Sequence, residues 1–74
     1  MKIKQSFIDR CGEITVKQIG EISKLCDRGL FNVIYAMIDP LEYEYAADIW
    51  KAAANVLKID LSDIYEVEPN TLTE

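Results

Sequence analysis

Apolar side chains recur at helical spacing along most of the chain, and this spacing predicts where the helices lie. A short first helix is predicted to end at Gly12 and to bury one face, made of Ile3, Phe7, Ile8 and Cys11. No segment alternates strictly between apolar and polar residues, as a half-buried strand would. The pattern therefore predicts an all-α fold with five helices and no strands.

The second predicted helix begins after Thr15. Thr15 followed by Gln18 is the capping-box pattern, in which each side chain bonds the backbone N–H of the other residue. We expect this helix to end near Ser23 or Lys24. Its buried face is expected to consist of Val16, Ile19 and Ile22.

The third predicted helix is the most apolar part of the chain. Residues 25–27 are expected to form a tight turn, so that the helix starts at Cys26 or Asp27. Pro40 ends it, because a proline pushes the residue before it out of the helical region. The apolar side chains of this helix are Leu30, Phe31, Val33, Ile34, Tyr35, Met37 and Ile38.

Two further helices are predicted in the second half of the chain. The fourth has an apolar stripe of helical period made of Ala46, Ile49, Trp50, Ala53, Val56 and Leu57. Residues 41–45 are compatible with a longer loop or with an extra turn at its start. Asp60 is expected to cap a last short helix from Leu61 to Glu66, with Ile64 and Tyr65 turned toward the body.

Seventy-four residues, half of them hydrophobic, allow one small core. We expect a single domain over residues 1–68 and a flexible tail over residues 69–74. The sequence shows no apolar run of roughly 18 residues and no signal-peptide pattern, so a cytoplasmic location without membrane contact is expected. A core this small leaves little room for an active-site cleft, so no small-molecule substrate is expected.

The chain has two cysteines and no histidine. Two thiolates alone make a poor zinc site, so Cys11 and Cys26 are expected to be reduced thiols among apolar neighbours. We find no Gly-rich phosphate loop, no nucleophile elbow and no cluster of metal ligands. The sequence therefore predicts a protein that is not an enzyme and has no catalytic residues, metal or cofactor.

The net charge of -5 is unevenly distributed. Residues 1–35 contain six Lys or Arg against four Asp or Glu, whereas residues 36–74 contain two against nine. Neutralisation of phosphates supplies most of the non-specific affinity for nucleic acid, and an acidic chain is poorly suited to it. The N-terminal half remains compatible with a duplex.

Two segments of the chain match the sequence pattern of a known protein family. The first has Thr15 at its start, Leu25 at the turn, Leu30 in the helix that follows and Pro40 at its end. The second is a closing run of apolar positions: Ala53, Ala54, Leu57, Ile59, Leu61 and Ile64. In these positions the chain resembles the Cro/C1-type helix-turn-helix repressors of phages and mobile elements. The resemblance implies a compact λ-repressor-like domain.

The chain departs from the family pattern at several positions. Gly20 replaces an alanine, and Ile34 and Ala36 replace a Glu-Gly pair. Lys24 stands where a glycine usually adopts a left-handed conformation, which would cost about 1 kcal/mol for another residue. Residues 41–45 are additional.

The family resemblance implies a transcription regulator whose third helix enters the major groove of operator DNA. Arg28 and Asn32, four residues apart on one helix face, would then read guanine and adenine. The residues implied at the DNA are Lys17, Gln18, Lys24, Asp27, Arg28, Phe31 and Asn32. A plainer interpretation makes Arg28 and Asn32 ordinary solvated residues.

The apolar excess of the third helix supports an alternative. A core this small cannot bury every apolar side chain of that helix, and exposed apolar patches usually mark protein interfaces. The face would consist of Phe31, Ile34, Tyr35 and Ile38. The domain would then form a homodimer or bind a repressor or another regulator, as antirepressors do. Ordinary core packing around the fourth helix is the remaining interpretation of these residues.

Overall fold

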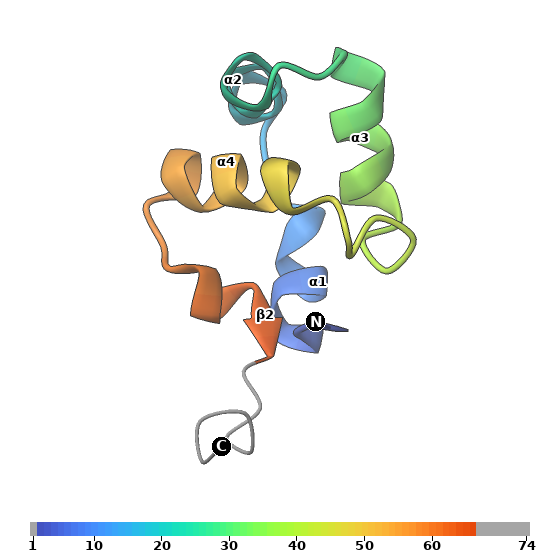
Figure 1. The fold of residues 1–74 in the computed structure, drawn as a ribbon, viewed down its shortest axis with the longest axis vertical. Helices are drawn as coiled ribbons and strands as arrows, with labels where there is room; N and C mark the ends of the chain where they lie inside the picture. The colour runs from blue at the N-terminus through green and yellow to red at the C-terminus, as the bar shows by residue number, and fades with distance from the viewer. Residues whose placement is uncertain (1, 67–74) are drawn as a thin grey trace.

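The structure, a computed structural model, describes residues 2–66 and is dominated by four α-helices (Figure 1). The helices are α1 (Gln5–Cys11), α2 (Val16–Cys26), α3 (Leu30–Ile38) and α4 (Ala47–Leu57). The smaller elements are β1 (Lys2–Ile3), the 3-10 turn η1 (Leu61–Asp63) and β2 (Tyr65–Glu66). The expected flexible tail, 69–74, and the expected domain end at residue 68 lie outside the described residues.

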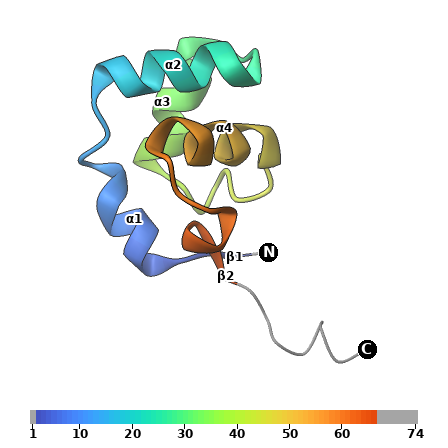
Figure 2. The same cartoon turned by 90° about the vertical axis from the view of Figure 1, so that its left-hand side faces the viewer.

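Helix α4 runs through the middle of the fold, between α2 and the small sheet (Figures 1 and 2). It packs against α2, while α3 packs against both α2 and α1. All four helices contribute to one core. Its fully buried centre is formed by Ile3, Phe7, Ile22, Val33, Ile49, Trp50 and Ile64. Within residues 2–66 no helix has the length and apolarity that crossing a bilayer requires.

Trp50 is the largest buried side chain and links distant parts of the fold. Its ring meets Phe7 of α1 edge-on, with ring centroids 5.7 Å apart and an angle of 89° between the planes. Aromatic pairs favour this arrangement because the positive ring edge faces the negative ring face. The Trp50 Nε1–H donates to the backbone carbonyl of Tyr43 at 2.8 Å, so the indole is buried with its polar atom satisfied.

The prediction of five helices without strands was wrong at the two ends of the described chain. β1 and β2 pair antiparallel, with Ile3 opposite Tyr65. The expected last helix, Leu61–Glu66, ends as a single 3-10 turn because the chain then extends to pair with β1. Two-residue strands are too short to show an alternating pattern. Ile64 and Tyr65 are buried, as predicted.

The segment between α3 and α4 is a loop of successive turns and not an extra helical turn, since α4 begins only at Ala47. Two side chains hold this loop through its backbone carbonyls. One is Trp50, described above, and the other is Tyr65, whose hydroxyl donates to the Glu44 carbonyl at 3.1 Å. The loop is therefore attached to the core although it lies at the surface.

The predicted bounds of α2 and α3 need correction. Helix α2 continues to Cys26 instead of ending near Ser23 or Lys24, and α3 begins at Leu30 instead of Cys26 or Asp27. Val16 was predicted to be buried but is 80% exposed, because it occupies the first position of α2. The predicted end of α3 before Asp39 is confirmed.

Candidate interaction site

Helices α2 and α3 are joined by a turn of three residues, Asp27, Arg28 and Gly29. Asp27 ends α2 in the left-handed conformation, with φ 57° and ψ 37°, and its N–H donates to the Ser23 carbonyl. The Ser23 hydroxyl donates to the Arg28 carbonyl at 2.6 Å, which fixes the direction of the turn. The assignment of the left-handed position to Lys24 was wrong, since Lys24 is helical.

The N-terminus of α2 shows the predicted capping box. Gln18 N–H donates to the Thr15 hydroxyl at 3.1 Å, and Thr15 N–H donates to Gln18 Oε1 at 2.9 Å. The Gln18 side-chain oxygen is therefore engaged within the protein, whereas the neighbouring Lys17 is exposed. Both residues lie at the opposite end of α2 from Arg28, about 15 Å away along the helix axis.

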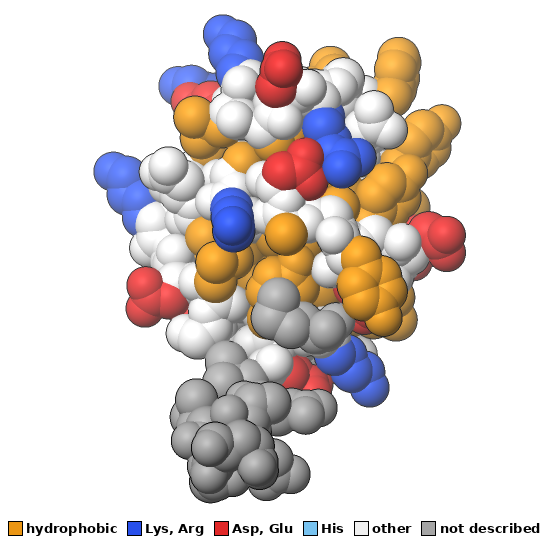
Figure 3. All heavy atoms as spheres, in the orientation of Figure 1, with side chains coloured by type: hydrophobic (Ala, Val, Ile, Leu, Met, Phe, Trp, Pro, Cys, Tyr) orange, Lys and Arg blue, Asp and Glu red, His pale blue; other side chains and the backbone are white. Residues whose placement is uncertain are grey.

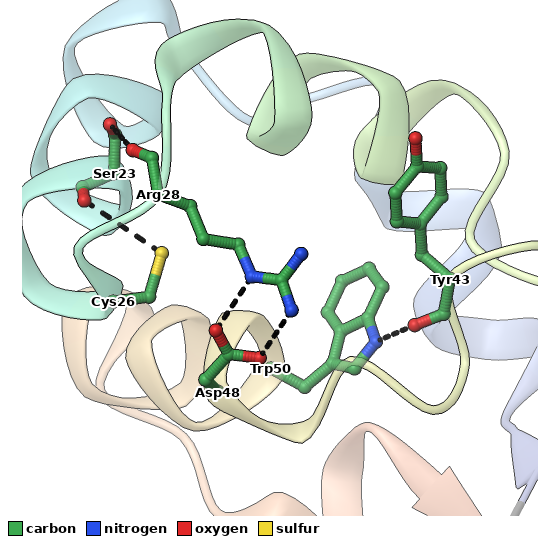
Figure 4. Close-up of polar contacts among 6 residues, drawn as sticks. All are labelled: Ser23, Cys26, Arg28, Tyr43, Asp48 and Trp50. Atoms are coloured by element: carbon green, nitrogen blue, oxygen red, sulfur yellow. Dashed lines mark hydrogen bonds and ion pairs between the residues drawn. The ribbon is translucent and has the colours of Figure 1, made fainter.

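Arg28 is bound to Asp48 in the first turn of α4 (Figure 4). Its Nε donates to Oδ2 at 2.6 Å and its Nη2 donates to Oδ1 at 3.1 Å, a bidentate pair. The ion pair lowers the pKa of Asp48 and raises that of Arg28. Both side chains remain partly open to solvent, with 37% of Arg28 and 45% of Asp48 exposed.

The geometry separates Arg28 from Asn32. Because α3 begins at Leu30, the expectation that Arg28 and Asn32 share one helix face four residues apart was wrong. Asn32 lies on α3 and is exposed, as are Lys24 and Asp27 near the turn. The predicted DNA-contacting residues thus fall into three groups: the start of α2, the turn with its ion pair, and α3.

The outer face of α3 is apolar. Phe31 is 72% exposed and Ile38 is 71% exposed, and Leu30 and Tyr35 are also exposed. Ile34, the fourth residue predicted for a partner-binding face, is only half-buried and belongs to its edge. Hydrophobic side chains gather along the side of the molecule that carries α3 (Figure 3). We use "α3 face" for Leu30, Phe31, Tyr35 and Ile38.

The sequence-based reasoning missed two exposed apolar residues, Leu41 and Tyr45, which follow α3 in the loop. Their exposure depends on how the loop folds back onto Trp50 and Tyr65, which no local pattern shows. The loop also brings acid to this region, since Asp39 and Glu42 are exposed and Glu42 N–H donates to the Asp39 carbonyl at 3.1 Å.

Charge is distributed unevenly around the α3 face. The segment from Gly29 to Trp50 contains four carboxylates and not one Lys or Arg. Helix α3 itself has no ionisable group other than the Tyr35 hydroxyl. The surface that would face phosphates in a helix-turn-helix protein therefore offers no cation from its helix or from the loop that follows.

The two cysteine thiols and a surface hollow lie outside the α3 face. Cys11 and Cys26 are free thiols, and burial raises the pKa of Cys11 to about 11. A hollow of about 360 Å³ beside Asp48 is lined by Leu25, Cys26, Asp48, Lys51, Ala52 and Asn55. Among residues 2–66, no three His, Cys, Asp or Glu side chains are grouped where they would hold a metal ion.

No family model matches this chain, and neither a curated protein nor a solved structure is significantly similar to it. The Cro/C1 resemblance therefore stays a prediction made from the residues, and so does the λ-repressor-like fold.

Proposed function

We propose that the chain is a small regulatory protein of helix-turn-helix architecture that binds another protein through the α3 face. The observation that carries this proposal is the exposure of four large apolar side chains on a helix without charge. Contiguous apolar surface of this kind is typical of protein interfaces, whose centres are poor in charged residues and rich in aromatic ones.

The charge distribution supports a protein partner over a nucleic acid. Specific DNA-binding proteins position the helix that reads the bases through many contacts to phosphate oxygens. Most of these contacts come from Lys, Arg and polar groups. The segment from Gly29 to Trp50 supplies carboxylates instead. Arg28, the nearest cation to α3 in the sequence, is held by Asp48.

Operator DNA is the second candidate, favoured by the helix-turn-helix arrangement and by three exposed polar side chains. Lys17 and Lys24 on α2 would contact phosphates, and Asn32 on α3 would pair with adenine. In this case α3 enters the major groove, and the free edge of the Arg28 guanidinium faces the DNA while Asp48 holds the other edge.

One paired experiment separates the two candidates. Tagged wild type, Phe31→Lys and Asn32→Ala are each used to capture partners from the host, with quantification by mass spectrometry. The same three proteins are tested for a mobility shift on the gene's own upstream region at low and high salt. Protein binding predicts a partner retained by Asn32→Ala and lost with Phe31→Lys, without a DNA shift.

DNA binding predicts a mobility shift instead of a captured protein partner. The duplex is retarded by wild type, retardation weakens with salt, and Asn32→Ala reduces it by a factor corresponding to about 1 to 3 kcal/mol. Phe31 is largely exposed, so circular dichroism of Phe31→Lys is expected to match that of wild type.

A further inference from the structure

The α3 face contains a stripe with the spacing of a helix-binding surface. Phe31, Tyr35 and Ile38 are separated by four and three residues, so they lie on one side of α3 over about two helical turns. All three are exposed. Helices that recognise a partner, including another helix as in coiled-coil zippers, do so through apolar anchors at this spacing on their own surface.

Negative charge is concentrated at one end of this stripe. Asp39 and Glu42 follow Ile38 directly, both are exposed, and the backbone bond between Glu42 and Asp39 keeps them in one turn. The C-terminus of α3 adds the partial negative charge of its last carbonyl groups. Since α3 has no basic residue in its last turn, this charge is not balanced within the helix.

We propose that the α3 face binds an amphipathic helix of a partner protein, whose apolar side covers Phe31, Tyr35 and Ile38 and whose Lys or Arg residues lie beside Asp39 and Glu42. The inference rests on the proposed function and specifies the chemistry of the partner. Apolar contact supplies the affinity, and charge complementarity selects the partner and its direction along α3.

A second copy of the chain fits this surface less well. If two α3 faces meet parallel, Asp39 and Glu42 of one copy approach the same residues of the other. If they meet antiparallel, these carboxylates approach the turn before α3, where Asp27 and Lys24 are both exposed. Both arrangements bring carboxylates together. The segment from Gly29 to Trp50 has no cation to separate them, and Arg28 is already bound to Asp48. Like charges across an interface disfavour such a pair.

Two synthetic peptide helices test the inference on the full chain. Both carry leucines on one side; one has lysines along its flank and the other has glutamates at the same positions. Fluorescence anisotropy of the labelled peptides is measured at low and high salt. We expect the lysine peptide to bind, with affinity falling as salt rises, and the glutamate peptide to bind at least about tenfold more weakly.

Matched variants locate the binding. Phe31→Ala is expected to weaken binding of the lysine peptide about tenfold or more, as removal of an aromatic anchor does. Glu42→Gln is expected to weaken binding of this peptide severalfold and to reduce the salt dependence of binding. Glu66→Gln, which removes the same charge from β2, is expected to leave binding unchanged. Equal effects of Glu42→Gln and Glu66→Gln would mean general charge attraction and would overturn the inference.

Three other results also overturn it. If neither peptide binds but a host protein is still captured through Phe31, the partner chemistry is wrong and the proposed function stands. If sedimentation shows a dimer that Phe31→Ala dissociates, a second copy occupies the face. If only the duplex binds, the proposed function fails together with the inference. Circular dichroism of each variant verifies that it is folded.

Discussion

The Arg28 guanidinium and the Asp48 carboxylate join the turn between α2 and α3 to the first turn of α4 through two parallel hydrogen bonds. The two residues of the pair are twenty positions apart in the sequence (Figure 4). It therefore fixes one end of α3 relative to the helix at the centre of the fold.

Replacing Asp48 by Asn is expected to lower the free energy of unfolding by up to about 1 kcal/mol near neutral pH, the range for partly exposed ion pairs. Folding lowers the pKa of Asp48 from its ordinary value of 3.8, so the stabilisation is present above that value and is lost as the pH falls through the lower pKa of the folded protein. Urea unfolding at about pH 7 and about pH 2 tests this. Equal stability of both proteins at both pH values would contradict it.

Replacing Asp27 by Gly is expected to raise the free energy of unfolding by about 0.5 to 1 kcal/mol, because Asp27 is left-handed and glycine adopts that conformation without steric cost. Lys24→Gly is the matched control. Lys24 lies inside α2, so the same replacement there is expected to lower the free energy of unfolding by about 1 kcal/mol. Opposite signs in thermal or urea unfolding would support the turn as described, and two losses of equal size would refute it.

Replacing Thr15 by Ala removes the hydroxyl that accepts the Gln18 N–H, and is expected to cost about 1 kcal/mol of unfolding free energy. The neighbouring Val16→Ala tests its exposure. A buried valine would cost more, whereas the exposed Val16 is expected to change the free energy by less than about 0.5 kcal/mol. A larger loss from Val16→Ala than from Thr15→Ala would mean that Val16 is part of the core.

Replacing Tyr65 by Phe keeps the buried ring but removes the hydrogen bond to the Glu44 carbonyl, at an expected cost of about 1 kcal/mol. Burial also raises the pKa of Tyr65 above its ordinary value of 10.0. The neutral hydroxyl is thus favoured in the folded protein, so stability is retained below that value and declines as the pH rises through the folded pKa. The free energy of unfolding of Tyr65→Phe is expected to decline less at alkaline pH than that of wild type in the same unfolding assay. Parallel pH profiles would contradict this role.

Cys26 is expected to react with iodoacetamide before Cys11. Burial shields Cys11 from the reagent and raises the pKa of its thiol to about 11, so little thiolate forms at about pH 8. Cys26 is only half-buried. Mass spectrometry of peptides sampled during alkylation gives the two rates, and Cys26→Ser shows the Cys11 rate alone. Faster labelling of Cys11 would mean that α1 opens readily.

Local chemistry made much of the fold predictable. Thr15 and Gln18 form a capping box because both partners lie three residues apart in sequence, and Pro40 ends α3 because its ring restricts the residue before it. The α4 stripe was also predictable, since its period matches one side of a helix.

The candidate site was predictable only in part. The exposure of Phe31, Tyr35 and Ile38 followed from counting apolar side chains against the size of the core. The partner of Arg28 did not, because Asp48 lies twenty residues away and no local spacing relates the two. Leu41 and Tyr45 were missed for the same reason, since the path of their loop depends on bonds from Trp50 and Tyr65.

The order of helices and the absence of Lys and Arg from the segment from Gly29 to Trp50 were determined by the sequence alone, because helical period and composition are properties of neighbouring residues. Tertiary structure decided where α3 begins, which ion pair holds the turn, and that the two ends of the described chain pair as strands. Those features depend on contacts between residues far apart in the chain, and their energies exist only once the core around Trp50 has brought the segments together.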